Sequence, residues 1–239
     1  MKRIDLVLEK TEIGPATAYA VKLQGALMRL IDTGLAEELH SENLRPYSLF
    51  AVRQDDCYVL RLSALSEKGY PLITACETVK EFHLSGARRT VHVLRRTEYE
   101  EITLEDMCVP APAAFSLVFT TPAVYKQKDR YQNWFSLPPL LTSVADKMRA
   151  FEGVDVPNEV LNEMDKSLII TDYELRTEIY PVKGGNYIKG FQGRMKCELT
   201  EPRPDIRAAL ILLLRYACFC GIGAKTALGM GGILLDESG

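Results

Sequence analysis

The order of the strands and helices that the sequence predicts constrains the fold of this chain more than any other feature. Residues 2–9 alternate between apolar and polar side chains, as a strand does, and apolar side chains then recur at helical spacing over residues 16–31. Two runs rich in β-forming residues, 47–52 and 57–65, are separated by "RQDD". This pattern predicts a hairpin after the first helix.

A second helix and a further strand complete the first hundred residues. A helical period with a proline in its first turn covers residues 71–84, and alternation resumes over residues 89–99. The full order is therefore β-α-β-β-α-β. This order predicts a ferredoxin-like domain, which is an antiparallel four-stranded sheet with two helices on one face.

The second half of the chain predicts the same order again. The segment "VPAPAAF", residues 109–115, is rich in proline and alanine, and we place the domain boundary there, between residues 1–109 and 114–239. Beyond it we expect, in order, a strand at "AFSLVFTT", a helix at "LPPLLTSVADKMRAF", two long strands joined by "KGGNYIK", a buried helix opened by Pro204 and a last strand at "GGILLD". The chain is thus predicted to be α+β, with tandem ferredoxin-like (RRM-like) domains.

Composition and charge narrow the class of protein. The chain is 47% hydrophobic and 26% charged, which is typical of a globular protein with a substantial core. Its net charge of −3 argues mildly against binding a polyanion, although residues 180–235 carry eight basic and three acidic side chains. Asp5 and Glu9 interrupt any secretory leader, so we expect a cytoplasmic protein without a membrane partner. The cysteines and histidines show no metal-ligand spacing, so we expect neither a metal nor a cofactor.

The segment "GIGAKTALGMGG", residues 221–232, is the most distinctive motif. A P-loop would require glycine before Lys225 and a helix after it, whereas here a helix leads in and a strand leads out. The dinucleotide fingerprint fails because Thr226 occupies its third glycine position. Two readings are left open: the loop presents bare N–H groups and one lysine to a phosphodiester, or its glycines only permit left-handed turns.

These features resemble a known family. The carboxy-terminal helix, the glycine-rich loop and the last strand are similar to those of the CRISPR-associated repeat-processing endoribonucleases of the RAMP superfamily. The segments "LQGALMRLI" and "LAEELHSENLRPYSLFAV" resemble that family's first helix and the histidine before its second strand. The resemblance spans nearly the whole chain. It implies an endoribonuclease that cuts CRISPR repeat RNA in precursor crRNA without a metal and leaves 5′-hydroxyl and 2′,3′-cyclic phosphate ends.

Such a cleavage reaction requires few functional groups. The ribose 2′-OH must lose a proton, the leaving 5′-oxygen must gain one, and charge on the phosphorane must be stabilised. His40 stands at the family's catalytic position, and a histidine, with an unperturbed pKa of about 6.5, suits this proton transfer. We expect Lys22, Arg29 and Arg45 to supply positive charge, the first two from one face of the first helix. Many family members have a tyrosine where this chain has Met28, which leaves Tyr47 as the candidate replacement.

Further residues are predicted to contact RNA. The glycine-rich loop and two basic segments, "GARRT" and "KGGNYIKGFQG", are the expected contacts, and the latter combines cations with aromatic rings. The candidates are Gly221, Gly223, Lys225, Thr226, Gly229, Gly231, Lys189, Arg194, Arg88 and Arg89.

Three hypotheses of function follow. The first is a CRISPR repeat endoribonuclease that acts as a monomer or homodimer. Its expected partners are the repeat RNA and proteins of the effector complex. The second is a non-catalytic RAMP-type subunit that binds crRNA within an effector complex. The third is an unrelated ferredoxin-like enzyme or regulator of small molecules.

Overall fold

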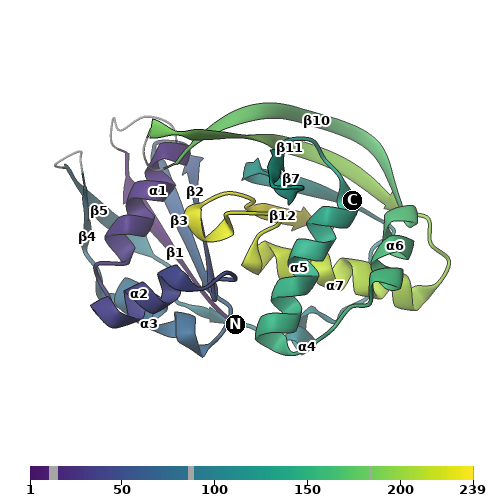
Figure 1. Ribbon diagram of the computed structural model, residues 1–239, viewed down its shortest axis with the longest axis horizontal. Coiled ribbons are helices and arrows are strands. Elements are labelled where there is room, and N and C mark those ends of the chain that lie inside the picture. Colours follow the sequence, from purple (N-terminus) through teal and green to yellow (C-terminus); the bar gives the residue numbers. More distant parts are fainter. Residues whose placement is uncertain (11–15, 86–88, 183–184, 239) are drawn as a thin grey trace. The chain divides into compact units, whose positions relative to one another are not determined.

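A computed structural model describes residues 1–10, 16–85, 89–182 and 185–238 of the chain (Figure 1). The chain divides into two units. The first comprises Met1–Glu101, Tyr180–Tyr187 and Lys225–Met230, and the second comprises Ile102–Ile179, Ile188–Ala224 and Gly231–Gly239. Two short segments from late in the sequence therefore belong to the first unit.

The first unit is built around one antiparallel sheet. Its elements are β1 (Lys2–Glu9), α1 (Ala16–Leu27), α2 (Thr33–Ser41), β2 (Tyr47–Gln54), β3 (Cys57–Ala64), the 3₁₀ turn η1 (Glu67–Gly69), α3 (Tyr70–Thr78), β4 (Glu81–Leu84), β5 (Arg89–Arg96) and β6 (Glu100–Glu101). The sheet order is β2-β3-β1-β5-β4, with β6 paired to β1. Both α1 and α3 contact this sheet. Alternate residues of β1, such as Leu6 and Leu8, are buried in the core, as the period of the sequence predicts.

Two elements of the first unit differ from the sequence prediction. The first helix ends at Leu27, and a separate helix, α2, begins at Thr33 because the Asp32 side chain accepts hydrogen bonds from the N–H groups of Gly34 and Leu35. The helix predicted over residues 71–84 ends at Thr78, and Glu81–Leu84 pairs with β5 as strand β4. The chain changes from helix to strand at Val79, whose backbone is extended.

The second unit repeats the same strand order. Its elements are α4 (Leu104–Met107), β7 (Ala114–Ala123), β8 (Tyr125–Gln127), β9 (Arg130–Gln132), α5 (Leu137–Glu152), α6 (Asn158–Lys166), β10 (Leu168–Pro181), β11 (Tyr187–Leu199), α7 (Pro204–Cys220) and β12 (Ile233–Asp236). The ends of β10 and β11 that face their connecting turn lie in the first unit, as does the 3₁₀ turn η3 (Thr226–Leu228). The sheet order is β10-β11-β7-β12, with β7 antiparallel to both neighbours.

Both sheets place their four principal strands in the same order. Numbered along each half, the strands lie 2-3-1-4, which is the arrangement that the β-α-β-β-α-β order predicts. The prediction of an α+β chain with tandem ferredoxin-like folds is therefore confirmed. Within the described part of the chain, no helix is both long enough and apolar enough to cross a lipid bilayer.

Candidate functional site

His40 lies in the last turn of α2, in the first unit. Its side chain is exposed, whereas its neighbour Leu39 is buried and anchors the helix. Among the described residues, no hydrogen bond or ion pair engages the His40 ring. The imidazole is therefore available to a ligand, and it sits on α2, a helix that is not among the predicted elements.

Arg45 is hydrogen-bonded to the main chain of His40. Its Nη2 donates a hydrogen bond to the main-chain carbonyl oxygen of His40 over 3.3 Å. That carbonyl belongs to the last turn of α2, where a cation is favourable because the carbonyl groups there carry the negative end of the helix dipole. The guanidinium group and the imidazole are thus held at the same end of one helix.

A lysine from outside the helix pairs with both acidic residues that flank His40 and offsets part of their negative charge. Lys68 Nζ lies 2.9 Å from Glu38 Oε1 and 2.8 Å from Glu42 Oε1. These hydrogen bonds, first to Glu42 and then to Glu38, raise the pKa of Lys68 above its ordinary value. The end of α2 is therefore less negative than its sequence indicates. Lys68 is not predictable as a neighbour of His40 from the sequence, because twenty-eight positions separate the two residues.

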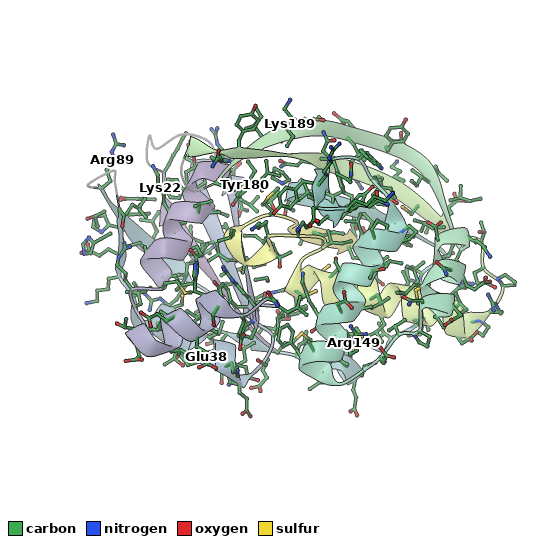
Figure 2. The ribbon with its side chains drawn as sticks, in the orientation of Figure 1. Lys22, Glu38, Arg89, Arg149, Tyr180 and Lys189 are labelled. Carbon is green, nitrogen blue, oxygen red and sulfur yellow. The ribbon has the colours of Figure 1, made fainter. Side chains whose placement is uncertain are left out.

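The remaining candidates of the active site are placed differently. Lys22 is half-buried on α1, and no described residue pairs with it (Figure 2). Arg29 follows the end of α1 and donates hydrogen bonds to the carbonyl oxygen of Gly25 and the hydroxyl of Ser85, both over 2.9 Å, and to the carbonyl oxygen of His83. Because the helix ends at Leu27, Lys22 and Arg29 do not share the helix face that the sequence analysis predicts.

Tyr47 belongs to the core. Its side chain is 1% exposed, and its hydroxyl accepts a hydrogen bond of 3.2 Å from Nε2 of Gln24, which is also buried. In this position the phenol of Tyr47 packs between α1 and β2, and in this conformation it cannot contact an RNA backbone. We therefore leave Tyr47 out of the catalytic group proposed below.

The glycines of the 221–232 loop are required by its backbone. Gly221, Gly223, Gly229 and Gly231 all have positive φ values, between 71° and 103°. A Cβ at Gly223 would lie 2.1 Å from the carbonyl oxygen of Val124, and one at Gly231 would lie 2.0 Å from that of Ile222. Only glycine fits both the torsion angle and the contact.

The loop uses most of its N–H groups internally. Hydrogen bonds within the protein engage the main-chain N–H groups of Gly221, Ile222, Gly223, Ala224, Leu228, Gly229, Met230, Gly231 and Gly232. The loop is therefore not the row of bare N–H groups that the sequence analysis offers as one reading. Lys225 is the one exposed residue of the loop, and its φ of 64° places a non-glycine residue in the left-handed region.

The middle of the loop packs within the first unit. The turn η3 contacts α1 and β2, and the Tyr180 hydroxyl donates a hydrogen bond to the carbonyl oxygen of Leu228. Gly229 lies against Ala20 of α1, at the amino-terminal side of Lys22. The segment that contains Lys225 therefore belongs to the first unit, and so do His40, Arg45 and Lys22.

The other predicted RNA contacts are spread over both units. Arg89 is exposed at the start of β5, and Lys189 is exposed on β11 (Figure 2). Arg194 is occupied, because its Nη2 lies 3.1 Å from Ser116 Oγ and 3.3 Å from Asp236 Oδ2. Thr226 is buried, and Arg88 lies outside the described residues.

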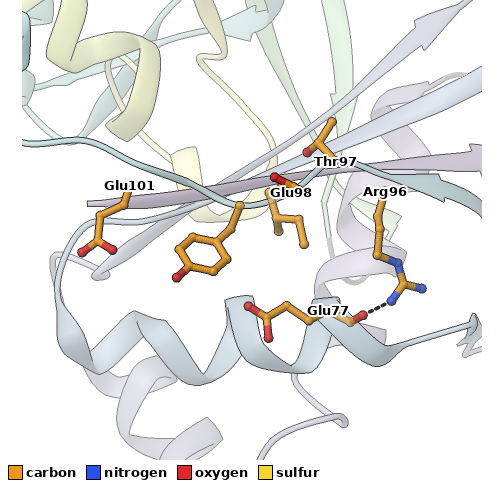
Figure 3. A pocket seen from close by; sticks show the side chains of 7 residues that line it. Glu77, Arg96, Thr97, Glu98 and Glu101 are labelled. Atoms are coloured by element: carbon orange, nitrogen blue, oxygen red, sulfur yellow. Dashed lines mark hydrogen bonds between the residues drawn. The ribbon is translucent and has the colours of Figure 1, made fainter.

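A hollow in the first unit has the wrong charge for RNA. It has a volume of about 710 Å³ and is lined by Glu77, Glu98, Glu101, Arg96 and three uncharged residues (Figure 3). The guanidinium of Arg96 donates to the main-chain carbonyls of Glu77 and Val79 and is not free to face a ligand. Three carboxylates and one engaged cation disfavour a polyanion at this place.

Comparisons with known proteins agree with the fold, and the residues that the family model matches include the glycine-rich loop. The family model of the CRISPR-associated endoribonuclease Cas6 matches residues 117–233. A CRISPR-associated endoribonuclease Cas6 of Streptococcus thermophilus is 24% identical over 99% of this chain and 99% of its own length. A Cas6 product complex superimposes with a TM-score of 0.81 at 22% identity and covers 98% of both chains. A RAMP protein binding different RNA substrates has a TM-score of 0.59 at 16% identity, over 98% of this chain and 99% of its own.

Proposed function

Since the chain belongs to the Cas6 family of CRISPR-associated endoribonucleases, we propose that it cuts CRISPR repeat RNA within precursor crRNA and so generates guide RNAs. The observation that carries the proposal is the end of α2. There an exposed imidazole with no partner among the described residues lies beside a fixed guanidinium group. We further propose that the protein acts in the cytoplasm as a monomer or homodimer and passes its product to effector-complex proteins.

The proposed reaction is a transesterification that needs no metal. The 2′-oxygen loses its proton and attacks the adjacent phosphorus, and the bond from phosphorus to the 5′-oxygen breaks. The leaving oxygen takes up a proton, so the ends are a 2′,3′-cyclic phosphate and a 5′-hydroxyl. His40 exchanges one of these protons, because imidazole gains and loses a proton near neutral pH.

Positive charge supports the phosphorane. Arginine remains protonated throughout, so Arg45 contributes charge and hydrogen bonds rather than proton transfer. Lys22 and Lys225 are the other cations of the first unit that we assign to the scissile phosphate or its neighbours. The pairing of Lys68 with Glu38 and Glu42 removes negative charge that would repel the RNA backbone.

The test is incubation of the full chain with its repeat RNA in EDTA, followed by analysis of the ends. We expect one cut with a cyclic phosphate and a 5′-hydroxyl, and no cut when the ribose at that position is 2′-deoxy. RNA that is bound tightly but never cut would instead assign the chain to the non-catalytic RAMP-type subunits. A protein without selective affinity for the repeat would refute both.

A further inference from the structure

The β8–β9 hairpin of the second unit has a fixed shape. Its two-residue turn places Lys128 at φ 46° and Asp129 at φ 61°, so both central residues are left-handed, as in a type I′ turn. Each non-glycine residue in that region costs about 1 kcal/mol. An ion pair of 2.8 Å between Lys126 Nζ and Asp129 Oδ1 braces the turn.

The register of the hairpin gathers polar side chains on one face. Gln127 is opposite Arg130, and Tyr125 is opposite Gln132. Residues that face each other across two strands point to the same side, so Gln127, Arg130 and Gln132 share a face. Together with Lys128 they line an open hollow. Lys126 and Tyr131 point to the opposite side.

The cations of this face differ from most others in the second unit. Among the described residues of that unit, seven cations form ion pairs with carboxylates, namely Lys126, Arg149, Lys166, Arg176, Arg194, Arg203 and Arg215. Lys128 and Arg130 are exposed, and neither has an ion pair with any described residue. Both are therefore free to neutralise phosphates.

An aromatic ring lies next to this face. Trp134 is 54% exposed, and its indole meets the buried ring of Tyr125 nearly edge-on, with the ring centroids 6.1 Å apart and an interplanar angle of 87°. Exposed aromatic faces stack on unpaired bases, and glutamine amides can donate to and accept from base edges. Such a combination suits single-stranded RNA better than a duplex, whose bases are already stacked and paired.

Hydrogen bonds from the glycine-rich loop fix the residues that lead into the β8–β9 hairpin. The N–H of Ala224 donates to the carbonyl oxygen of Val124 over 2.8 Å, and the N–H of Gly231 donates to that of Pro122 over 2.9 Å. Gly223 allows this approach because it has no side chain to strike Val124. The glycine-rich loop therefore holds the start of the hairpin in place.

We propose that the β8–β9 hairpin and Trp134 bind an unpaired segment of the repeat RNA. Lys128 and Arg130 contact its phosphates, Gln127 and Gln132 contact base edges, and Trp134 stacks on a base. The proposal rests on the proposed function, because it names a further contact for the same RNA.

The test compares two double variants of the full chain. Lys128→Ala/Arg130→Ala removes two unpaired cations, and the control Arg149→Ala/Lys166→Ala removes two that are paired with Asp146 and Glu163. Binding is measured by fluorescence anisotropy, across a range of salt concentrations, with repeat RNA that is 2′-deoxy at the scissile ribose. We expect about 10-fold weaker binding for the hairpin variant and a salt slope smaller by about 1.4, for two single-strand phosphates. The control should stay within about 2-fold of wild type.

A second variant and a crosslink test the same proposal without loss of charge. Trp134→Ala should weaken binding by about 5-fold or more. In the wild-type protein, 4-thiouridine in an unpaired part of the repeat should crosslink to residues 125–135. Crosslinks confined to other peptides would overturn the proposal, even if a variant failed to fold.

The outcomes separate this proposal from the proposed function. If wild type binds and cuts the repeat while the hairpin variant binds equally well, the hairpin proposal alone is wrong. Equal losses in the hairpin variant and the control would also overturn it, because net charge would then explain the effect. Unchanged RNA binding with loss of a protein partner would assign the hairpin to that partner instead. Failure of wild type to bind the repeat would refute the proposed function itself.

Discussion

The guanidinium group of Arg45 donates a hydrogen bond to the main-chain carbonyl oxygen of His40, with 3.3 Å between Nη2 and the oxygen. The bond joins the segment that enters β2 to the last turn of α2. It fixes the position of a cation at the place where the proposed general acid or base is held. The two residues are therefore expected to act together, and each can be changed separately.

Replacement of Arg45 should affect cleavage more than folding. In Arg45→Ala both the cation and its tie to α2 are lost, and we expect single-turnover cleavage to slow by about 10- to 100-fold. Arg45→Lys keeps the charge but not the planar donor group, so it should recover only part of the rate. Rates at saturating protein measure the effect.

Arg53→Ala is the matched control for Arg45→Ala. Arg53 is an exposed arginine of the same unit whose Nε donates to a main-chain carbonyl, that of Asp55. We expect its rate to stay within about 2-fold of wild type. Equal rates for Arg45→Ala and Arg53→Ala would remove Arg45 from the proposed site.

Lys225 should bind RNA through its charge rather than through its unusual backbone. Lys225→Ala and Lys225→Gly both remove the ammonium group, so both should weaken binding of the repeat by about 3- to 10-fold. Only the glycine variant relieves the left-handed conformation, and it should gain up to about 1 kcal/mol of stability. Anisotropy and urea unfolding separate the two effects. If the alanine and glycine variants bound RNA as tightly as wild type, Lys225 would have no role in binding.

The glycines of the loop should be essential to folding. A methyl group at Gly223 or Gly231 meets a carbonyl oxygen near 2 Å at a positive φ. We expect Gly223→Ala and Gly231→Ala each to cost about 2–4 kcal/mol in the free energy of unfolding. Gly25→Ala in α1 is the control, because a Cβ there meets nothing within 4 Å. It should be neutral or stabilising by up to about 1 kcal/mol. Comparable losses at all three positions in urea unfolding would contradict this interpretation of the loop.

Lys147 should make stability depend on pH in the alkaline range. It is 6% exposed in α5, and its Nζ donates to the carbonyl oxygens of Cys220 and Gly221 over 3.0 Å each, at the root of the glycine-rich loop. Burial lowers the pKa of its ammonium group below lysine's ordinary value. Between the folded and unfolded pKa values, the unfolded chain binds more protons, so stability rises with pH towards about 10.4.

The comparison with Lys147→Met isolates that dependence. Wild type should gain free energy of unfolding relative to the variant as the pH rises towards about 10.4, the ordinary pKa of lysine. The Cys220 thiol, whose pKa burial raises to about 11, is present in both proteins and largely cancels in the difference. Urea unfolding at several pH values provides the measurement, with the exposed Lys166→Met as a control that should show no such rise. A difference between wild type and Lys147→Met that does not change with pH would contradict the assignment.

The sequence predicts the fold well because its periods are long. The alternation in β1, the β-rich runs of β2 and β3 and the buried helix after Pro204 extend over many residues, so each pattern indicates one type of element. Short elements are missed. Strand β4 has only four residues, and it follows α3 so closely that one helical period spans both. Helix α2 buries only Leu39, and its clearest signal is Asp32 at the N-cap.

The candidate site is less predictable than the fold. The choice of His40 follows from the resemblance to the family, but the pairing of Lys68 with Glu38 and Glu42 depends on tertiary contact. Tyr47 looks available in the sequence, and only the structure shows its hydroxyl buried on Gln24. For the glycine-rich loop, the spacing of the glycines cannot tell whether N–H groups face a ligand or the protein. The hydrogen bonds of the folded chain decide that question.

His40 carries the central claim, and its single-turnover rate tests that claim most directly. Full-length wild type, His40→Ala, and the controls His83→Ala and His92→Ala are each mixed in excess with labelled repeat RNA in EDTA, and the affinity of each is measured alongside. We expect His40→Ala to bind the repeat normally and to cut it about 10²- to 10⁴-fold more slowly than wild type, whereas the two controls keep the wild-type rate. Cleavage by His40→Ala at the wild-type rate would contradict the account.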